Sequence, residues 1–326
     1  MTKIAVLGPN PAWQKTLFFT NFNKGSVNRA RTMDSLASGK GINFCRALSC
    51  AKKSRYTLIQ FSGGNNGRLL DEALERSRMD FISIKVKGDT RCCITCLDES
   101  AQVMTELIEP SFPASPEEAE ELLTAFDQVL EGAAGAAFCG SLPDGTDPIL
   151  YVKAAALAAK HHALLLIDAF RDLSEVFGAA EQVLLKINKE ELEKLSGEKG
   201  IDAGLKKLFS TYNSLKYAAI TDGPENAFAS DGTSLAEYTL PQLPQVISPL
   251  GCGDTASAIL LSEVCSGTPL FTAFQHALAA ASANCLNATP GSYKIEDAEK
   301  LLPSFRIRNL CPVYNPQQNG WFPLDL

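Results

Sequence analysis

The sequence predicts an α/β fold built around a parallel sheet. Short apolar runs, typical of buried strands, alternate along the chain with stretches in which apolar residues recur at helical spacing. The chain has 326 residues, of which 45% are hydrophobic and 21% charged, so it can bury a large core. Strands that alternate with helices in a chain of this kind indicate an α/β domain.

The first apolar run, Lys3–Leu7, ends at the turn-forming triplet Gly8-Pro9-Asn10 and begins the predicted sheet. Further strands are expected at Ala136–Cys139, Leu164–Asp168, Val183–Ile187 and Tyr217–Thr221. Helical spacing between these runs predicts helices at 148–160 and 190–195. Three more helices, which would cover one sheet face, are expected at Asp254–Cys265, Pro269–Leu286 and Ile295–Leu302.

Two stretches interrupt this alternation, Thr16–Arg31 and Lys85–Leu107. Both interleave polar and apolar residues, as extended chain does, and no crossover helix separates their halves. We expect a small accessory sheet formed by the segments near 11–31 and 85–108. The main domain, residues 1–310, would then resume at a helix with Ser115 at its cap.

The tail from 311 to 326 contains three prolines and shows no periodicity. We interpret it as a C-terminal extension that wraps a surface of the domain or a neighbouring subunit.

Composition and charge exclude several classes of protein. The net charge of −7 and an isoelectric point near 5.2 argue against nucleic acid or an anionic membrane as the main partner, because both bind basic surfaces. No run approaches the ~20 apolar residues of a membrane span, and the N-terminus is too short for a signal-peptide core. A cytoplasmic location is therefore expected.

The ten cysteines fall in apparent core segments and are expected to be reduced. The tightest group, Cys92, Cys93 and Cys96, lies in an apolar run and lacks a fourth zinc ligand nearby.

The segment from Gly251 to Asp254, Gly-Cys-Gly-Asp, directly precedes an apolar helical pattern. Unsatisfied N–H groups at a glycine-rich helix N-terminus, together with the helix dipole, form an anion site suited to a phosphate in transfer. Asp254 could then accept the proton of an attacking hydroxyl. The alternative is that Asp254 simply caps the helix.

A second glycine-rich segment, Ala37–Leu48, also enters a helix. It is not a P-loop, since the only Gly-Lys pair is followed by Gly41 instead of Ser or Thr. A dinucleotide fingerprint fails as well, because no G-x-G-x-x-G follows the first strand.

The two segments together resemble the signatures of the ribokinase-like (PfkB) sugar kinases. Residues 38–43 are similar to the family's G-G-K-G-x-N, and residues 251–254 to its G-x-G-D. The phosphosugar branch, which includes 1-phosphofructokinase, tagatose-6-phosphate kinase and a minor 6-phosphofructokinase, gives the best match. Its short motifs are resembled by Asn10-Pro11-Ala12, Val27-Asn28-Arg29, Gly88-Asp89-Thr90-Arg91, 139–145 and 186–192.

The resemblance spans about residues 1–305 and implies a doubly wound, mostly parallel sheet with helices on both faces. The accessory sheet becomes a small β lid through which many members form homodimers. The implied activity is transfer of the γ-phosphate of ATP, with Mg²⁺, to a hydroxyl of a phosphorylated ketohexose: fructose 1-phosphate, fructose 6-phosphate or tagatose 6-phosphate.

The resemblance also implies a role for individual residues. The catalytic group comprises Asp254 as general base and the backbone of Gly251, Cys252 and Gly253 as anion hole. The substrate group comprises Gln14, Arg29, Gly39, Lys40, Asn43, Arg91 and Ser141. The ATP group comprises Asn188, Thr221, Gly223, Asn226 and Asn284, and Asn188 and Glu191 would hold Mg²⁺ through waters. Asn188 and Glu191 also fit a helix capping box, which is compatible with a metal role.

Some positions depart from the family pattern. Gln14 stands where the branch usually has an acid, so the substrate or its affinity differs. Ser38 replaces the first signature glycine, and Ser248-Pro249 precedes G-x-G-D. Asn226 stands where a second glycine is usual, and Asn is the next best residue at positive φ. In the segment 168–171, which differs from the family's D-x-S-G, Arg171 is a surface residue or a phosphate contact.

Two other functions stay open. A kinase of an unphosphorylated sugar or nucleoside is disfavoured by Arg29, Lys40 and Arg91, three cations that a neutral substrate would leave without an anionic partner. The other is a non-catalytic sugar-phosphate or nucleotide sensor that kept the fold. The sequence leaves open the particular sugar, the nucleotide preference and any need for a monovalent cation.

Overall fold

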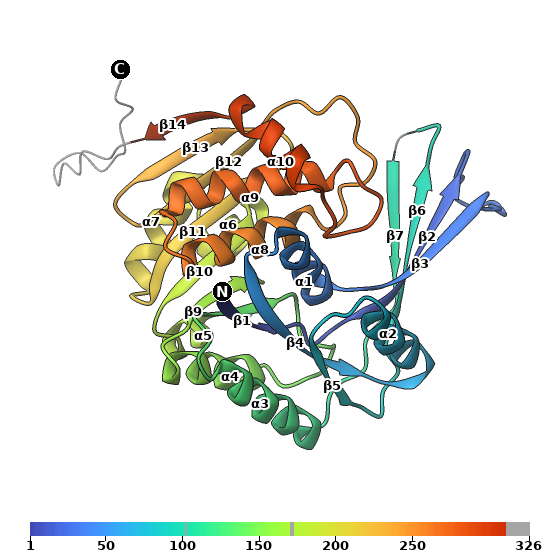
Figure 1. The fold of residues 1–326 in the computed structure, drawn as a ribbon, viewed down its shortest axis with the longest axis horizontal. Helices are drawn as coiled ribbons and strands as arrows, with labels where there is room; N and C mark the ends of the chain where they lie inside the picture. Colours follow the sequence, from blue (N-terminus) through green and yellow to red (C-terminus); the bar gives the residue numbers. More distant parts are fainter. Residues whose placement is uncertain (102, 170–172, 311–326) are drawn as a thin grey trace.

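The structure, a computed structural model, describes residues 1–101, 103–169 and 173–310 (Figure 1). The expected extension at 311–326 lies outside the described residues. In the described part of the chain, the main sheet comprises β1 Thr2–Leu7, β4 Ser54–Ser62, β5 Phe81–Lys85, β8 Gly135–Cys139, β9 Leu164–Asp168, β10 Val183–Asn188, β11 Leu215–Asp222, β12 Asn226–Ser230, β13 Leu235–Thr239 and β14 Arg306–Leu310. Their spatial order is β14-β13-β12-β11-β10-β9-β8-β1-β4-β5.

The sheet is parallel from β5 across to β11, and antiparallel pairing then adds β12, β13 and β14 at one edge. The five main-sheet strands expected from the sequence, now β1, β8, β9, β10 and β11, are confirmed. The sequence analysis missed β4, β5 and the three edge strands. β12 contains two Ala and one Asn, which are poor strand formers, so its extended state depends on pairing with β11 and β13.

Helices cover both faces of the main sheet, as the resemblance implied. Their bounds are α1 Lys40–Ala51, α2 Gly64–Arg76, α3 Pro116–Leu130, α4 Ile149–Lys160, α5 Ser174–Ala179, α6 Lys189–Ser196, α7 Ile201–Thr211, α8 Cys252–Cys265, α9 Leu270–Asn284 and α10 Ile295–Leu301. The three expected C-terminal helices are α8, α9 and α10. Ser115 caps α3 with a full capping box, in agreement with the sequence.

Side chains of each central strand alternate between two hydrophobic cores. In β1, Ile4 and Val6 pack with residues of α1, α2, α8, α9 and α10, whereas Ala5 and Leu7 pack with residues of α3 to α7. A strand buried on both faces needs apolar residues at successive positions, which explains the unbroken apolar run that identified β1.

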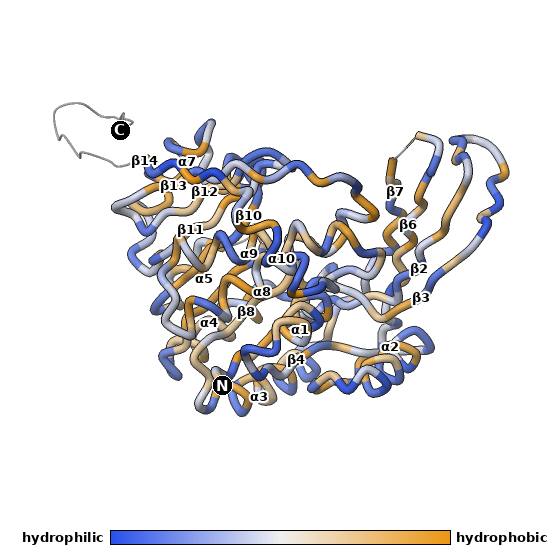
Figure 2. Tube along the Cα trace, turned by 45° about the horizontal axis from the view of Figure 1, so that its top comes forward, coloured by the Kyte–Doolittle hydropathy of each residue, from blue (hydrophilic) through white to orange (hydrophobic). Residues whose placement is uncertain are grey.

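A separate four-stranded sheet has the order β3-β2-β6-β7 and projects from the main body (Figure 1). Its strands are β2 Ala12–Phe19, β3 Thr32–Ser38, β6 Cys92–Asp98 and β7 Val103–Ile108. We call this sheet the lid. Figure 2 shows hydrophobic residues along the projecting strands, and Met33, Val103 and Leu107 are exposed there.

The expected bounds of the lid strands need correction. Residues 20–31 form a loop, not a strand, and β3 begins after it. The side chain of Asn28 holds this loop closed: its Oδ1 accepts from the N–H of Asn23, and its Nδ2 donates to the carbonyls of Asn23 and Ser26. Lys85 ends β5 of the main sheet, so only the later part of the second stretch belongs to the lid.

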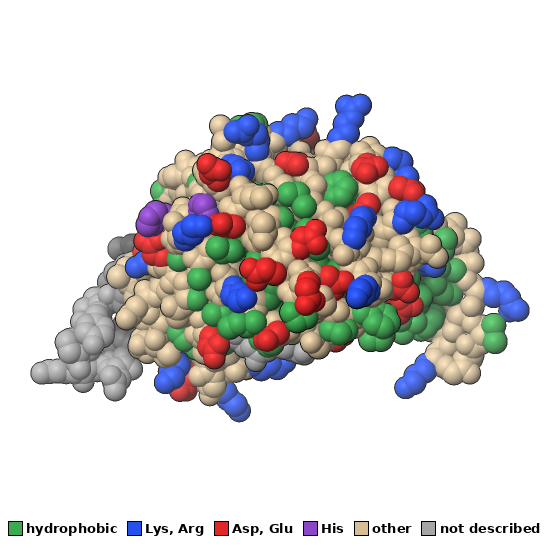
Figure 3. All heavy atoms as spheres, turned by 90° about the horizontal axis from the view of Figure 1, so that it is seen from below, with side chains coloured by type: hydrophobic (Ala, Val, Ile, Leu, Met, Phe, Trp, Pro, Cys, Tyr) green, Lys and Arg blue, Asp and Glu red, His purple; other side chains and the backbone are tan. Residues whose placement is uncertain are grey.

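Acidic and basic side chains are interspersed over the face of the molecule seen in Figure 3. No helix within the described ranges is long and apolar enough to span a membrane.

Candidate active site

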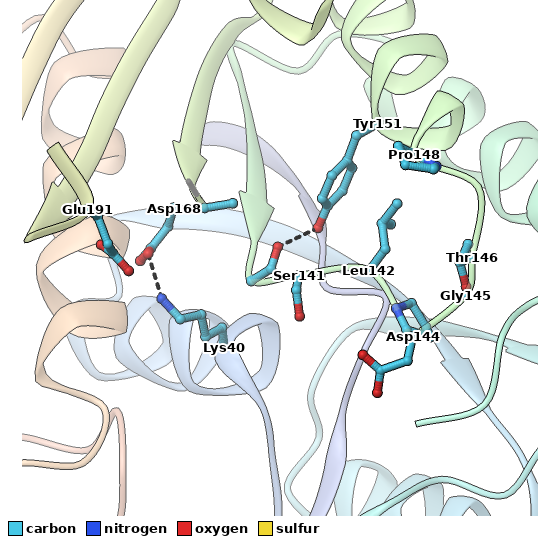
Figure 4. Close-up of a pocket in the computed structure, with 13 residues that line it drawn as sticks. Lys40, Ser141, Leu142, Asp144, Gly145, Thr146, Pro148, Tyr151, Asp168 and Glu191 are labelled. Carbon is cyan, nitrogen blue, oxygen red and sulfur yellow. Dashed lines mark hydrogen bonds and ion pairs between the residues drawn. The ribbon is translucent and has the colours of Figure 1, made fainter. Parts of the chain in front are cut away.

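The candidate site lies at the carboxyl ends of the parallel strands, where α1 and α8 begin. Ligands of open α/β sheets bind at this edge. A cavity of about 420 Å³ is lined by Lys40, Ser141, Asp168 and Glu191 among others (Figure 4). A larger cavity of about 1110 Å³ adjoins the start of α8 and is lined by residues from β10, β11, α8 and α9.

The N-terminus of α8 has the backbone that its glycines permit. Gly251 is the N-cap with φ 81°, and a Cβ there would lie 2.6 Å from the backbone nitrogen of Gly291. Only glycine fits this conformation and this close approach. Cys252 and Gly253 line the larger cavity, so the first turn of the helix adjoins it. The N–H of Cys252 donates to the Pro249 carbonyl at 3.3 Å, so this member of the expected anion hole already has a partner.

Asp254 lies in the first turn of α8 with only 7% of its surface exposed. Its Oδ2 accepts a hydrogen bond of 2.8 Å from Nδ2 of Asn43 on α1. The N-cap position is occupied by Gly251, so the reading of Asp254 as a simple cap is wrong. Burial raises the pKa of Asp254, and Asp168 adds to this, whereas Lys40 and the bond from Asn43 oppose it.

Asn43 joins the two glycine-rich segments. Its Oδ1 accepts from Arg46 Nη1 at 3.0 Å and from the Ser38 hydroxyl at 3.2 Å, and the side chain is buried. Ser38, the departure from the signature glycine, therefore supports Asn43. Gly39 caps α1 with φ 120°, and a Cβ there would lie 2.9 Å from Cα of Pro11.

A buried ion network links Lys40 to the centre of the sheet. The Lys40 ammonium donates to Asp168 Oδ1 at 2.6 Å, Ser257 donates to Oδ2 at 2.7 Å, and Nζ of buried Lys186 lies 3.9 Å from Oδ2. Burial of Asp168 opposes ionisation, but Lys186 and Lys40 outweigh it and lower its pKa to about 2. Burial alone would lower the pKa of Lys40, but the nearby carboxylates of Asp168 and Asp254 outweigh burial and raise it.

Asp168, Lys186 and Ser257 were not among the site residues expected from the sequence. The available signal was their position: Asp168 and Lys186 stand at or near the ends of predicted parallel strands, which meet at one sheet edge. A Cβ on Gly253 would lie 3.0 Å from Nζ of Lys186, so this ammonium sits directly behind the α8 N-terminus.

Asn188 and Glu191 form the capping box of α6. Asn188 Oδ1 accepts from the Glu191 N–H, and Glu191 Oε2 accepts from the Asn188 N–H, both at 2.9 Å. Glu191 faces the smaller cavity near Lys40, and Asn188 lines the larger one (Figure 4). The pair therefore stands between the two spaces.

The expected ATP residues separate into two groups. Asn188, Thr221 and Gly223 line the larger cavity, whereas Asn226 and Asn284 are not among its lining residues. Asn226 begins β12 and is not a positive-φ residue, so the expectation of a left-handed backbone there is wrong: strand pairing with Thr239 sets it. Buried Asn284 donates from Nδ2 to the Leu250 carbonyl at 2.9 Å, which holds the turn before α8.

The lid carries Gln14 and Arg29 at different distances from the site. Gln14 is buried on β2, where its Nε2 donates to the Thr95 hydroxyl on β6 at 2.7 Å. Arg29 is exposed on the loop beyond β2. Arg29 lies past one end of β2, and Lys40 lies near the other end. Because the eight residues of β2 span about 25 Å, Arg29 does not reach Lys40 of the same chain.

Arg91 lies where the lid joins the main domain. Its Nη2 donates to the Asn10 carbonyl at 3.1 Å, and its buried Nε has no hydrogen-bond partner in the structure. Arg171, the other candidate phosphate contact, lies outside the described residues.

The fold is a mostly parallel sheet with helices on both faces and a small lid, and a buried carboxylate lies in the first turn of α8. The chain belongs to the pfkB family carbohydrate kinases, whose profile matches residues 1–296. The protein is thus a phosphotransferase that acts on an alcohol acceptor.

One curated relative is similar in sequence, and two solved structures share the fold. A tagatose-6-phosphate kinase from Staphylococcus epidermidis is 29% identical over 266 residues, 79% of this chain and 84% of that protein. Phosphofructokinase-2 from Escherichia coli, solved with fructose-6-phosphate, has a TM-score of 0.82 at 21% identity and covers 93% of this chain and 99% of its own. A possible 1-phosphofructokinase from Thermotoga maritima has a TM-score of 0.83 at 17% identity, with 94% and 99% covered.

Proposed function

We propose that this protein transfers the γ-phosphate of ATP to a hydroxyl of a phosphorylated ketohexose, with Asp254 as general base. The observation that carries the proposal is the buried Asp254 carboxylate in the first turn of α8, held by Asn43 and surrounded by Lys40 and Lys186. A carboxylate at a helix N-terminus can accept a hydroxyl proton beside the site that binds the transferring phosphate.

The charge of the phosphoryl group is matched by fixed dipoles and cations. The first turn of α8 adjoins the larger cavity, and the helix dipole adds positive potential there. Lys186 lies behind the same turn. These groups are positioned before the substrates arrive, so they would stabilise the transition state without reorganisation.

Phosphorylated sugars are favoured as acceptors because cationic groups lie at the smaller cavity and at the lid junction. Lys40 lines the cavity, and Arg91 has a buried Nε without a partner that a sugar phosphate could satisfy. Ser141 lines the same cavity and offers a hydroxyl. The relative that phosphorylates tagatose 6-phosphate by its name supports this class of acceptor.

ATP is assigned to the larger cavity, beside Thr221 and Gly223. Asn188 and Glu191 fit a Mg²⁺ ion bound largely through waters. Oε1 of Glu191 takes no part in the capping box, and Oδ1 of Asn188 accepts one hydrogen bond there and keeps a second lone pair. Mg²⁺ would neutralise charge on the ATP phosphates at this position.

We also propose a homodimer through the lid. Met33 and Leu107, 54% and 52% exposed, lie on one face of the lid, because the strand register aligns them with Leu17 and Ile94. A second copy of this sheet would cover that face. Arg29 of the partner subunit would then be free to reach this subunit's sugar phosphate, which Arg29 of the same chain does not do.

The test is ADP release from Mg-ATP with fructose 1-phosphate, fructose 6-phosphate, tagatose 6-phosphate, fructose and ribose. One phosphosugar should support turnover, and Asp254→Asn should lose it by a factor on the order of hundreds or more. The matched control is Asp71→Asn, which alters a buried carboxylate outside the site. Because burial raises the pKa of Asp254, kcat/KM should fall with acid at a pH above the ordinary Asp value of about 3.9.

Other outcomes separate the alternatives. Turnover of fructose or ribose alone would favour a kinase of unphosphorylated sugars. Binding of sugar phosphate or nucleotide with no turnover of any acceptor would favour a sensor.

A further inference from the structure

Two cysteines far apart in sequence meet inside the larger cavity. Cys252 is the first residue of α8 and Cys285 the C-cap of α9, and their Sγ atoms are 3.1 Å apart. A disulfide has an S–S distance of about 2.05 Å, so closure needs a movement of about 1 Å. Both residues line the cavity and are only partly buried, so a small oxidant can reach them.

The two thiols also differ in reactivity. The hydrogen bond from Cys252 lowers the pKa of Cys285 despite burial, whereas the same bond and burial raise the pKa of Cys252. Of the described cysteines whose pKa is shifted, the others are all raised, mainly by burial. Thiolates react with peroxides and thiols do not, so Cys285 is the nucleophile and Cys252 the resolving thiol.

The pair is connected to the proposed anion site by hydrogen bonds. The carbonyl of Cys285 accepts from the N–H groups of Ile247 and Ser248, at the start of the loop that leads to Gly251. Asn284 bonds both the Leu250 carbonyl and, at 3.2 Å, Sγ of Cys252. A bond between the sulfurs therefore acts on the loop that sets the N-terminus of α8.

We propose that Cys252 and Cys285 are a modification site at which hydrogen peroxide forms a disulfide that excludes nucleotide from the larger cavity. The Cys285 thiolate attacks a peroxide oxygen, the O–O bond breaks, and a sulfenic acid forms as hydroxide departs. The hydroxide takes up the proton that Cys285 released on ionisation and leaves as water. Cys252 sulfur then attacks the sulfenic sulfur, and its proton departs with the hydroxyl as a second water. Two thiols are oxidised and one peroxide is reduced. The effect on nucleotide rests on the proposed placement of ATP.

The experiment treats the reduced full-length chain with hydrogen peroxide, with and without ADP. Non-reducing peptide mass spectrometry measures the Cys252–Cys285 link, and a fluorescent ADP analogue measures affinity. The disulfide link should form, and ADP should slow its formation by about tenfold. The affinity of the linked protein for the ADP analogue should be lower by about tenfold, and reduction by dithiothreitol should restore it. Cys285→Ser should remove both effects, while Cys265→Ser, on the far end of α8, should keep them.

Absence of the link in peroxide-treated protein would overturn the modification site. A link that leaves ADP affinity unchanged would overturn its effect on nucleotide. Phosphosugar turnover by the reduced protein, measured in parallel, tests the proposed function separately. If Cys285→Ser does not fold, protection of the wild-type thiols by ADP decides the same question.

Discussion

Asp168 shows how one buried carboxylate serves several neighbours. Its carboxylate accepts hydrogen bonds from Lys40 on α1 and Ser257 on α8, and it forms an ion pair with Lys186 on β10. These contacts connect the cavity wall to the sheet. A buried ion pair contributes little net stability, but removing one partner leaves an uncompensated charge. Lys186, with only 6% of its side chain exposed, would be that charge.

Asp168→Asn is expected to lower the free energy of unfolding by about 3–5 kcal/mol at neutral pH. The folded-state pKa of Asp168, about 2, lies below the ordinary value, so its ionised form stabilises the fold above about pH 4. That contribution is lost as the pH falls toward 2. Urea denaturation across pH should show the difference between wild type and variant shrinking with acid, and a constant difference would contradict the assignment.

At the scale of the element, α3 and α6 provide a natural comparison. Both begin with a full capping box, from Ser115 to Glu118 in α3 and from Asn188 to Glu191 in α6. The first lies away from the cavities, and the second stands between them. The same local chemistry is therefore present with and without an adjacent site.

Ser115→Ala and Asn188→Ala should each lower the free energy of unfolding by about 1 kcal/mol, because each leaves a helix N–H without its partner. Only Asn188→Ala should also raise the Mg²⁺ concentration needed for half-maximal turnover. Thermal denaturation and a magnesium titration measure the two effects. Equal magnesium dependence in the two variants would show that Asn188 acts as a cap alone.

The elements that could be predicted from the sequence are those determined by residues adjacent in the chain. The buried strands β1, β8, β9, β10 and β11, the Ser115 cap and the glycine turn before α8 were predicted because adjacent residues determine them. The sequence analysis missed Asp168, Lys186 and the β3 strand, whose roles depend on partners brought from other segments. The positive φ expected at Asn226 failed for the same reason, since pairing of β12 with β13 outweighed the local preference.

For the whole molecule, the lid determines the expected assembly. Its face with Met33, Val103 and Leu107 is apolar and exposed, which is unusual for a surface that stays in water. Leu107→Glu should therefore convert a dimer to a monomer and weaken phosphosugar binding, because Arg29 of the partner subunit is lost.

Sedimentation at micromolar concentration measures the mass, with Ile149→Glu as control, since Ile149 is 43% exposed on α4. The control should remain dimeric. A wild-type protein that is monomeric and fully active would exclude the lid interface.

The hydrogen bond between Asn43 and Asp254 joins residues 211 positions apart. A ribosome has released most of the chain before Asp254 exists, while α1 already carries its half of the site. Contacts this distant in sequence close late and slowly during folding. A nascent or truncated chain that stops before α8 would therefore hold Asn43 without Asp254. With Asp254 as the proposed base, phosphate transfer is expected to begin only when synthesis of the domain is nearly complete.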